Sequence, residues 1–440
     1  MTTFNAVIQL VYVLAAACFV IGLHLMNSPA TARRGNQVST AGMAVAGVAT
    51  LVLLIHEGSV TAAGWTVLIV GALLGSAAGL WSAQRVQMTA MPQLVSMFNA
   101  VGGGAAALVA IYEYVNDESA GWGVLGLSTT SVFTVLDVII GSVTFTGSLI
   151  AAGKLQGVIG GQPIMLPGGK YLSLLAAVVA IGTGAFMLTT ASLPALVIVI
   201  IASLGFGVLM VLPIGGADMP VVISLLNAFT GTAVAMAGFV VGNWALIVAG
   251  ALVGASGGIL TKLMADAMNR SLGNIILGGF GTGDTAVAAG PGTDNASIKS
   301  IAADDAAIQL AYASKVIIVP GYGLAAAQAQ HGVAELANLL EERGVEVSYA
   351  IHPVAGRMPG HMNVLLAEAN VPYPQLKEME EINPEFPRAD VALVIGANDV
   401  TNPAARRAGT AISGMPILDV DQAKSIIVGK RSMGTGYAGI

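Results

Sequence analysis

Long apolar runs joined by short polar stretches fill the first 265 residues of the chain. A helix needs about 20 apolar residues to cross the hydrocarbon core of a bilayer, and in lipid it must satisfy its own backbone hydrogen bonds. The pattern therefore predicts a polytopic α-helical membrane domain over residues 1–265. Its nine predicted spans cover residues 4–26, 39–56, 64–81, 92–115, 128–153, 171–189, 193–212, 220–241 and 243–264.

The pattern changes after residue 265. Residues 266–300 are rich in glycine and have neither helical nor strand periodicity, which predicts a linker. Short apolar runs then recur, with a helical pattern to about Arg343 between the first two, and this alternation is typical of a parallel sheet. We therefore predict a Rossmann-like, doubly wound α/β domain over residues 301–440. Its predicted strands are Lys315–Pro320, Val345–Ile351, Val391–Ile395 and Ser425–Val428.

Composition supports the division into two parts. Only 10% of the 440 residues are charged and 55% are hydrophobic, whereas an average soluble domain has roughly 25% charged residues. Residues 1–265 hold six Lys or Arg and six Asp or Glu, and residues 266–440 hold twelve and eighteen. A net charge of −6 provides no basic face for nucleic acid, and the single Cys18 has no partner for a disulfide. We predict no metal site.

The basic residues predict an orientation, because short cytoplasmic loops carry the excess of Lys and Arg. Nine crossings with the basic loops inside place the N-terminus outside and the polar C-terminal domain in the cytoplasm. The first apolar run has no basic segment before it and no clear cleavage site after it, so we expect a retained helix and not a signal peptide. The residues that carry this orientation are Arg33, Arg34, Arg85, Lys154, Lys170, Lys262 and Arg270.

Four polar residues lie in or beside the predicted spans. Asn99, Asp137 and Asn227 lie within spans, and Asp218 comes just before the eighth. An ionisable or amide group at membrane depth is costly and commonly marks an ion or proton route. The alternative is interhelical hydrogen bonding, and the sequence leaves both open.

The turn after the first predicted strand is suited to a dinucleotide. Gly321 and Gly323 permit a tight turn and a close approach of the backbone to a pyrophosphate, and Ala326 occupies the small-residue position for helix packing. The start of the following helix would face the anion. A plain tight turn in another doubly wound domain is the alternative.

The ends of the other strands favour NADP over NAD. No acid follows the second strand, where a site for NAD usually has one for the ribose 2′-hydroxyl. Lys430, Arg431 and Ser432 follow the fourth strand and are suited to clamp a phosphate monoester, with the glycine-rich segment Met433–Tyr437 able to fold over a ligand. The third strand ends in Gly396, Ala397, Asn398 and Asp399. The simpler alternative for Lys430 and Arg431 is a solvated charge pair in a loop. For Asp399 it is an Asx turn after the strand.

Together these motifs resemble the beta subunit of the bacterial proton-translocating NAD(P) transhydrogenase over nearly the whole chain. The resemblance is carried by Gly215–Pro220 with Asn227, Pro320–Gly323, Ala325–Gln330, Ile351–Leu366, Val394–Asp399 and Lys430–Met433. It implies an enzyme of the bacterial inner membrane that passes a hydride from NADH to NADP⁺ while protons move into the cytoplasm.

The resemblance also implies site residues, which join those predicted from the residues themselves. We expect Asn398 and Asp399 to be catalytic. The resemblance places Asp218 and Asn227 on the proton path, and we expect Asn99 and Asp137 to belong to it too. The NADP(H) contacts that the resemblance implies are Tyr322, Val354, Ala355, Gly356, Arg357, Met358, Pro359, Asn398, Asp399, Gly414, Met415, Lys430, Arg431, Ser432, Met433, Gly434, Thr435, Gly436 and Tyr437. The positions of Gly321, Gly323, Ala326, Gly396 and Ala397 after predicted strands add these five to the expected contacts.

Hydride transfer requires two nicotinamides in contact, and this chain offers one dinucleotide fold. NAD(H) must therefore bind another polypeptide, which the family places on the alpha subunit, in an assembly with two copies of each half. Coupling requires that proton binding and NADP binding bias the same two states. We expect the linker and the segment around Tyr437 to move.

Two features depart from the family. Many members have a histidine where this chain has Asn99. The proton relay must therefore use one of three alternatives. These are water held by Asn99 and Asn227, the carboxyl group of Asp137, or a group from partner helices. The chain also stops at Ile440, where the family continues, and we expect a truncated chain.

Two other functions stay open. One is an ion channel or transporter gated by a nucleotide-sensing Rossmann domain, although the sequence has no carbonyl filter of the potassium-channel type. The other is a structural membrane subunit whose nucleotide does not react.

Overall fold

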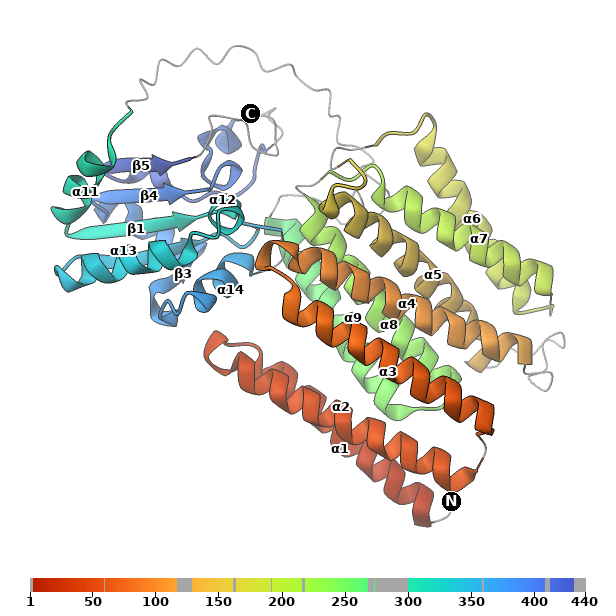
Figure 1. Cartoon of the computed structure of the whole chain (residues 1–440). Helices are drawn as coiled ribbons and strands as arrows, with labels where there is room; N and C mark the ends of the chain where they lie inside the picture. The colour runs from red at the N-terminus through yellow and green to blue at the C-terminus, as the bar shows by residue number, and fades with distance from the viewer. Residues whose placement is uncertain are drawn as a thin grey trace. The chain divides into compact units, whose positions relative to one another are not determined.

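The computed structural model describes most of the chain in two compact units (Figure 1). One unit comprises Met1–Pro213 and Val222–Leu260, and the other Ile214–Val221 and Thr261–Ile440. The predicted linker lies almost entirely outside the described residues, and the predicted boundary at residue 265 stays a prediction. The described residues are 3–58, 60–116, 129–160, 164–190, 192–215, 218–267, 273, 300–357, 360–407 and 412–430.

Nine helices of the described residues are long and apolar enough to cross a membrane, which confirms the predicted spans. The largest difference is at the second, which begins at Pro29 and not at residue 39, because Ser28 and Pro29 form a helix start before the apolar run. The helices are α1 Thr3–Leu25, α2 Pro29–Glu57, α3 Ala62–Arg85, α4 Met91–Asn116, α5 Thr129–Gln156, α6 Gly169–Met187, α7 Leu193–Val211, α8 Met219–Val240 and α9 Trp244–Ala267.

Small residues hold the central helices together. A Cβ atom on Gly141 of α5 would lie 2.5 Å from the carbonyl oxygen of Gly103 on α4, and one on Gly231 of α8 would lie 2.4 Å from the nitrogen of Gly254 on α9. Only glycine allows helix backbones to approach so closely. These glycines therefore form contacts between helices.

The C-terminal unit contains a five-stranded parallel sheet of order β3-β2-β1-β4-β5, which confirms the Rossmann-like prediction. Val316 of β1 pairs with Val347 of β2 on one side and Val391 of β4 on the other. The order reverses between β1 and β4, and ligands of open α/β sheets bind at such a switch point. The elements are α11 Ala303–Ala311, β1 Lys315–Pro320, α12 Tyr322–Ala326, α13 Gln330–Glu342, β2 Glu346–Ile351, α14 His361–Glu368, β3 Leu376–Glu378, α15 Met379–Ile382, β4 Val391–Ile395 and β5 Ser425–Gly429, with short 3₁₀ turns between them.

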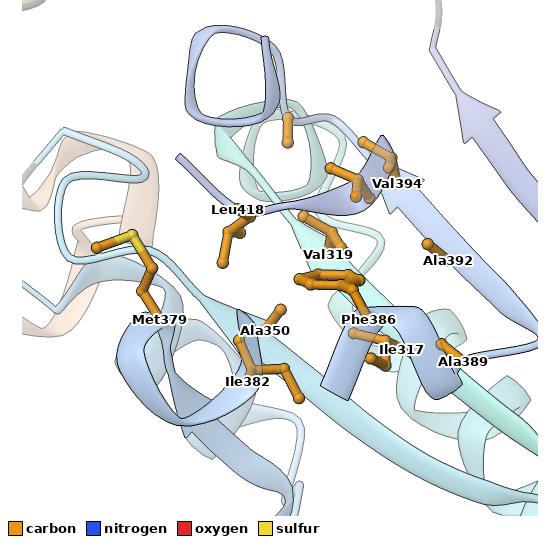
Figure 2. Close-up of a cluster of buried hydrophobic side chains, with 12 residues drawn as sticks. Ile317, Val319, Ala350, Met379, Ile382, Phe386, Ala389, Ala392, Val394 and Leu418 are labelled. Carbon is orange, nitrogen blue, oxygen red and sulfur yellow. The ribbon is translucent and has the colours of Figure 1, made fainter. Parts of the chain in front are cut away.

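The core on one face of this sheet is shown in Figure 2. Ile317 and Val319 of β1 point toward the buried ring of Phe386, while the alternate residues Val316 and Ile318 are equally buried on the other face. Burial on both faces explains why β1 is apolar at nearly every position.

Two details differ from the prediction. The strand β3 was not predicted, because its three residues Leu376–Glu378 include Lys377 and Glu378 and have no apolar run. The helix predicted to continue to about Arg343 is two helices, α12 and α13. Gln328 between them has a φ of 51°, in the left-handed region that ends a helix.

Asp390 joins the amino ends of three strands. Its carboxylate accepts hydrogen bonds from the backbone nitrogens of Ser314 and Lys315 at 2.8 and 3.1 Å and from Lys424 Nζ at 2.8 Å. The Lys424 bond, followed by the two backbone bonds, lowers the pKa of Asp390 to about 2.

We expect Asp390 to make the unfolding of the C-terminal unit depend on pH. A lowered pKa means that its stabilisation is present above the usual value of 3.8 and is lost as the pH falls toward 2. Asp390→Asn should lower the free energy of unfolding by about 1 kcal/mol at pH 7, allowing for solvent screening. Urea titrations at pH 7 and pH 3 test this, because the difference between the variant and the wild type should be smaller at pH 3.

Candidate functional site

The loops that follow β1, β4 and β5 meet at the carboxyl edge of the sheet. Gly321 N donates to Ile395 O at 2.9 Å, Gly323 N donates to Gly396 O at 2.9 Å, and Gly396 N donates to Gly429 O at 3.3 Å. The described parts of these loops carry the predicted contacts Gly321, Tyr322, Gly323, Ala326, Gly396 to Asp399 and Lys430, so the fold brings these segments together at the switch point.

The glycines at this edge serve a contact that the sequence did not reveal. A Cβ on Gly321 would lie 2.3 Å from Ala397 Cα, and a Cβ on Gly396 would lie 2.3 Å from Leu324 N. Gly396 also has a φ of +71°. The glycines therefore let two loops of the protein interlock.

The turn after β1 also differs from the predicted anion site. The N–H groups of Gly321 and Gly323 already donate to β4 and its loop, and α12 has only five residues. The expectation of one long helix after this turn is therefore wrong, and the anion site at the turn stays a prediction. Tyr322 and Ala326 are the ends of this short helix.

The loop after β2 is held by two buried histidines. His352 Nδ1 accepts from Val354 N at 3.3 Å, so its Nε2 carries the proton and donates to Pro416 O at 2.9 Å. His361 Nδ1 accepts from Arg357 N at 3.0 Å. Burial is the main cause that lowers the pKa of both rings, to about 4 for His361, where the charge of Arg357 adds to it. Neutral imidazoles can act as these acceptors.

Arg357, Tyr322 and His361 form one aromatic and cationic group at this edge. The Arg357 guanidinium carbon lies 4.3 Å from the centroid of the Tyr322 ring, and the Tyr322 and His361 rings are 6.0 Å apart in an edge-on arrangement. Gly356 has a φ of +113°, and a Cβ there would lie 2.5 Å from the His361 ring. The predicted residues Gly356 and Arg357 thus lie beside His361, while Val354 N and Ala355 N donate to His352.

The loop after β4 carries Asn398 and Asp399. Thr401 Oγ1 donates to Asn398 O at 2.9 Å, and both predicted catalytic side chains are part-buried. Farther along, Gly414 N donates to Ala405 O at 2.8 Å, and Met415 packs on a small cluster of Ala405, Ile412 and Ile417. Pro416 next to Met415 accepts the His352 bond, which links this segment to the loop after β2.

The predicted phosphate clamp follows β5, which is the fourth of the strands predicted from the sequence. Lys430 follows β5 directly and is exposed, beside the strand end that hydrogen-bonds Gly396. Met358, Pro359, Arg431, Ser432, Met433, Gly434, Thr435, Gly436 and Tyr437 lie outside the described residues.

The four predicted proton-path residues differ in their surroundings. Asn99 on α4 is 5% exposed and Asp137 on α5 is 0% exposed, whereas Asn227 on α8 is part-buried. Asp218 directly precedes α8, is part-buried and belongs with the C-terminal unit. Asn99 and Asp137 are therefore buried polar groups inside the bundle.

Comparisons with known proteins agree with this architecture. The family described as NAD(P) transhydrogenase beta subunit matches residues 8–440. Two curated relatives named NAD(P) transhydrogenase subunit beta, both from Rhodospirillum rubrum, are 49% identical over 432 residues, 98% of this chain and 92% of each relative. This chain belongs to the NAD(P) transhydrogenase beta subunit family.

Membership confirms the resemblance seen in the sequence. The family implies nicotinamide nucleotide binding, and the name beta subunit implies an alpha subunit as partner. The nine apolar helices fit a multi-pass membrane protein. The family and the relatives therefore support the function of a transhydrogenase beta subunit.

The sequence missed His352 and His361 as residues that shape the site. Both lie in Ile351–Leu366, which was named only as part of the family resemblance. Two histidines in one short loop were the available signal. Their role as acceptors depends on a loop conformation that periodicity does not predict.

We expect His361→Phe to weaken nucleotide binding, because it leaves the Arg357 N–H without its acceptor. The loss should be about 1–3 kcal/mol, or about tenfold or more in affinity. His361→Asn should be milder, since its side-chain oxygen can occupy the position of Nδ1. Equal affinities of the two variants, measured by isothermal titration, would contradict this role.

Proposed function

We propose that this chain binds NADP(H) and accepts a hydride from NADH held by its alpha subunit, with proton translocation into the cytoplasm. The main support is the convergence of the β1, β2, β4 and β5 loops at the carboxyl edge of a parallel sheet in a member of this family. Neither a nucleotide-gated channel nor an inert structural subunit is favoured by any feature of this edge.

The donor set at this edge fits an anionic nucleotide. Arg357 lies over Tyr322, and Lys430 stands exposed at the end of β5, so two cations flank the interlocked glycine loops. In this proposal Lys430, Arg431 and Ser432 hold the 2′-phosphate of NADP. No acid directly follows β2, where His352 is instead buried and bonded to Pro416. The absence of an acid at that position supports NADP over NAD.

The other residues orient the nucleotide in this proposal. Tyr322, Val354, Ala355, Gly356, Arg357, Met358 and Pro359 form one wall, and Gly396, Ala397, Gly414 and Met415 form another. Asn398 and Asp399 take the catalytic positions, and Gly434 to Tyr437 close over the ligand. The bound nucleotide supplies the nicotinamide carbon that accepts the hydride. The protein positions this ring and excludes water from it.

The membrane unit supplies the proton path in this proposal. Asn99, Asp137, Asp218 and Asn227 carry it across the bacterial inner membrane, with the N-terminus outside and the nucleotide domain in the cytoplasm. NAD(H) binds the alpha subunit, and two copies of each half form the enzyme. Proton binding and NADP binding each favour one of the same two states, so each changes the affinity for the other.

A reconstitution assay tests this function. The purified chain, with and without an alpha subunit, is placed in proteoliposomes that carry a pH-sensitive dye, and hydride transfer from NADH to an NADP analogue is followed. Activity that requires the partner and moves protons is the expected result. Tight NADP binding with no transfer under any condition would instead favour the nucleotide-gated transporter.

A further inference from the structure

Helices α4, α5 and α8 meet along a seam inside the membrane unit. Ser96 Oγ of α4 donates to Ser148 O of α5 at 2.8 Å, and Thr230 Oγ1 of α8 donates to Asn99 O of α4 at 3.3 Å. Farther along, Ile140 of α5 packs against three alanines of the other two helices. These alanines are Ala106, Ala233 and Ala237.

Asp137 points into this seam. Four residues before it, Phe133 stacks on Phe239 of α8 with ring centroids 4.1 Å apart, and four residues after it, Gly141 meets the backbone of Gly103 on α4. Residues four apart lie on one face of a helix. Asp137 therefore lies between α4 and α8, level with the small side chains of Ala110 and Ala237.

The surroundings of Asp137 do not satisfy its carboxyl group. The residue is 0% exposed, and neither Oδ1 nor Oδ2 has a hydrogen-bond partner among the described residues. Each unsatisfied polar atom in such a place costs stability, so a sequence retains it where it serves a purpose. Asp137 thus differs from Ser96, whose hydroxyl is bonded across the helix interface.

Further polar residues continue from Asp137 along the same face of α5. Thr144 and Ser148 lie seven and eleven residues after it, about 10 and 16 Å along the helix at 1.5 Å per residue. Both are buried, and Asn99 and Thr230 lie beside them. We call Asp137, Thr144, Ser148, Ser96, Asn99 and Thr230 the seam stripe. It runs from the bundle interior toward the end of α5.

Asp137 is the one ionisable side chain of the seam stripe. Among the described residues, α7 and α8 have no Asp, Glu, His, Lys, Arg or Tyr. The titratable groups of α4 are Tyr112, Glu113 and Tyr114, about four turns from Asn99, and α5 has otherwise only Lys154. Glu113 lies on the α8 side of α4 by periodicity and is the other acid among the described residues of α4, α5, α7 and α8.

We propose that Asp137 is the residue that binds and releases the translocated proton. This assignment rests on the proposed function and selects one residue of its path. A proton adds to one carboxyl oxygen of Asp137 from the side of Glu113 and leaves along the seam stripe toward Asn99 and Ser96. No electrons move in this step, because the hydride stays with the nucleotides. Water held between the hydroxyls and amides of the stripe carries the proton, because Thr144 lies about 10 Å along α5 from Asp137. The side chains of the stripe do not store it.

Asp137→Asn keeps the shape of the side chain and removes its titration. In proteoliposomes with the alpha subunit, we expect dye-detected proton movement and steady-state transfer to fall at least tenfold. NADP affinity should stay within twofold, and the temperature of unfolding should be equal to or above that of the wild type. Asp137→Glu should recover part of both rates. Ser203→Ala, at a fully buried hydroxyl of α7, is the matched control and should be active.

Three outcomes decide between the readings. Wild-type proton movement and turnover in Asp137→Asn would overturn the proposal while leaving the proposed function intact. A lower unfolding temperature together with lost NADP binding in Asp137→Asn, without recovery in Asp137→Glu, would assign Asp137 a structural role and also overturn it. Failure of the wild type to transfer hydride or move protons would overturn the proposed function itself.

Discussion

Gly396→Ala should disrupt the carboxyl edge of the sheet and abolish NADP binding. The new Cβ would lie 2.3 Å from Leu324 N and 2.6 Å from two further backbone atoms of Gly323, at a φ of +71°. The left-handed conformation costs a residue with a side chain roughly 1–2 kcal/mol, and overpacking against backbone that cannot yield adds about 1–3 kcal/mol. Thermal unfolding and NADP titration of the full chain measure the two effects.

Gly332→Ala is the matched control for this prediction. Gly332 lies within α13, and a Cβ there would meet no atom within 4 Å. Alanine in a helix interior is favoured over glycine by about 0.5–1 kcal/mol, so this variant should bind NADP normally and unfold at an equal or higher temperature. If both alanine variants bound NADP with wild-type affinity, the interlocked loops would have no part in the site.

Lys430→Ala with Arg431→Ala should weaken NADPH far more than NADH at the same site. Hydrogen bonds to a charged group contribute about 1.5–3 kcal/mol, so loss of the clamp should cost NADPH about 100-fold in affinity. NADH has no 2′-phosphate and should lose little. Competition titrations of the two reduced nucleotides give this ratio directly.

The control for the clamp removes two positive charges elsewhere on the same unit. Arg343 follows α13 and Arg388 precedes β4, so both lie near the amino ends of strands, and both are exposed. Arg343→Ala with Arg388→Ala should leave the preference for NADPH unchanged. Equal weakening of NADPH and NADH by the Lys430 and Arg431 pair would remove the clamp from the proposed function.

The elements with strong apolar patterns were predicted correctly. The strands β1, β2, β4 and β5 and the spans, apart from the start of the second, were found within a few residues, because lipid and a sheet buried on both faces each demand long or continuous apolar runs. The strand β3 escaped prediction because its three residues pair at an edge of the sheet and need no apolar run. The break at Gln328 escaped because a left-handed residue between two helical segments leaves no mark on periodicity.

The candidate site was predicted in its parts but not in its contacts. Gly321 and Gly323 were recognised as turn residues and Gly396 as the end of a strand, yet the reason for each glycine lies in a loop about 75 residues away, which the pairing of β1 with β4 brings into contact. Lys430 could be named because it follows a predicted strand. His352 and His361 could not, because their role depends on which backbone nitrogens turn toward their rings.

Composition and periodicity were sufficient to establish a membrane bundle followed by a nucleotide-binding fold, since both depend on which residues can be removed from water. The sequence showed Asp137 as an acid within a span, but it did not show which helices the side chain faces. Only packing decided that it faces the seam of α4, α5 and α8 and that neither oxygen finds a partner among the described residues. The hydrophobicity of a residue predicts whether that residue is buried. Which side chains it contacts depends on how the separate helices align when they pack together.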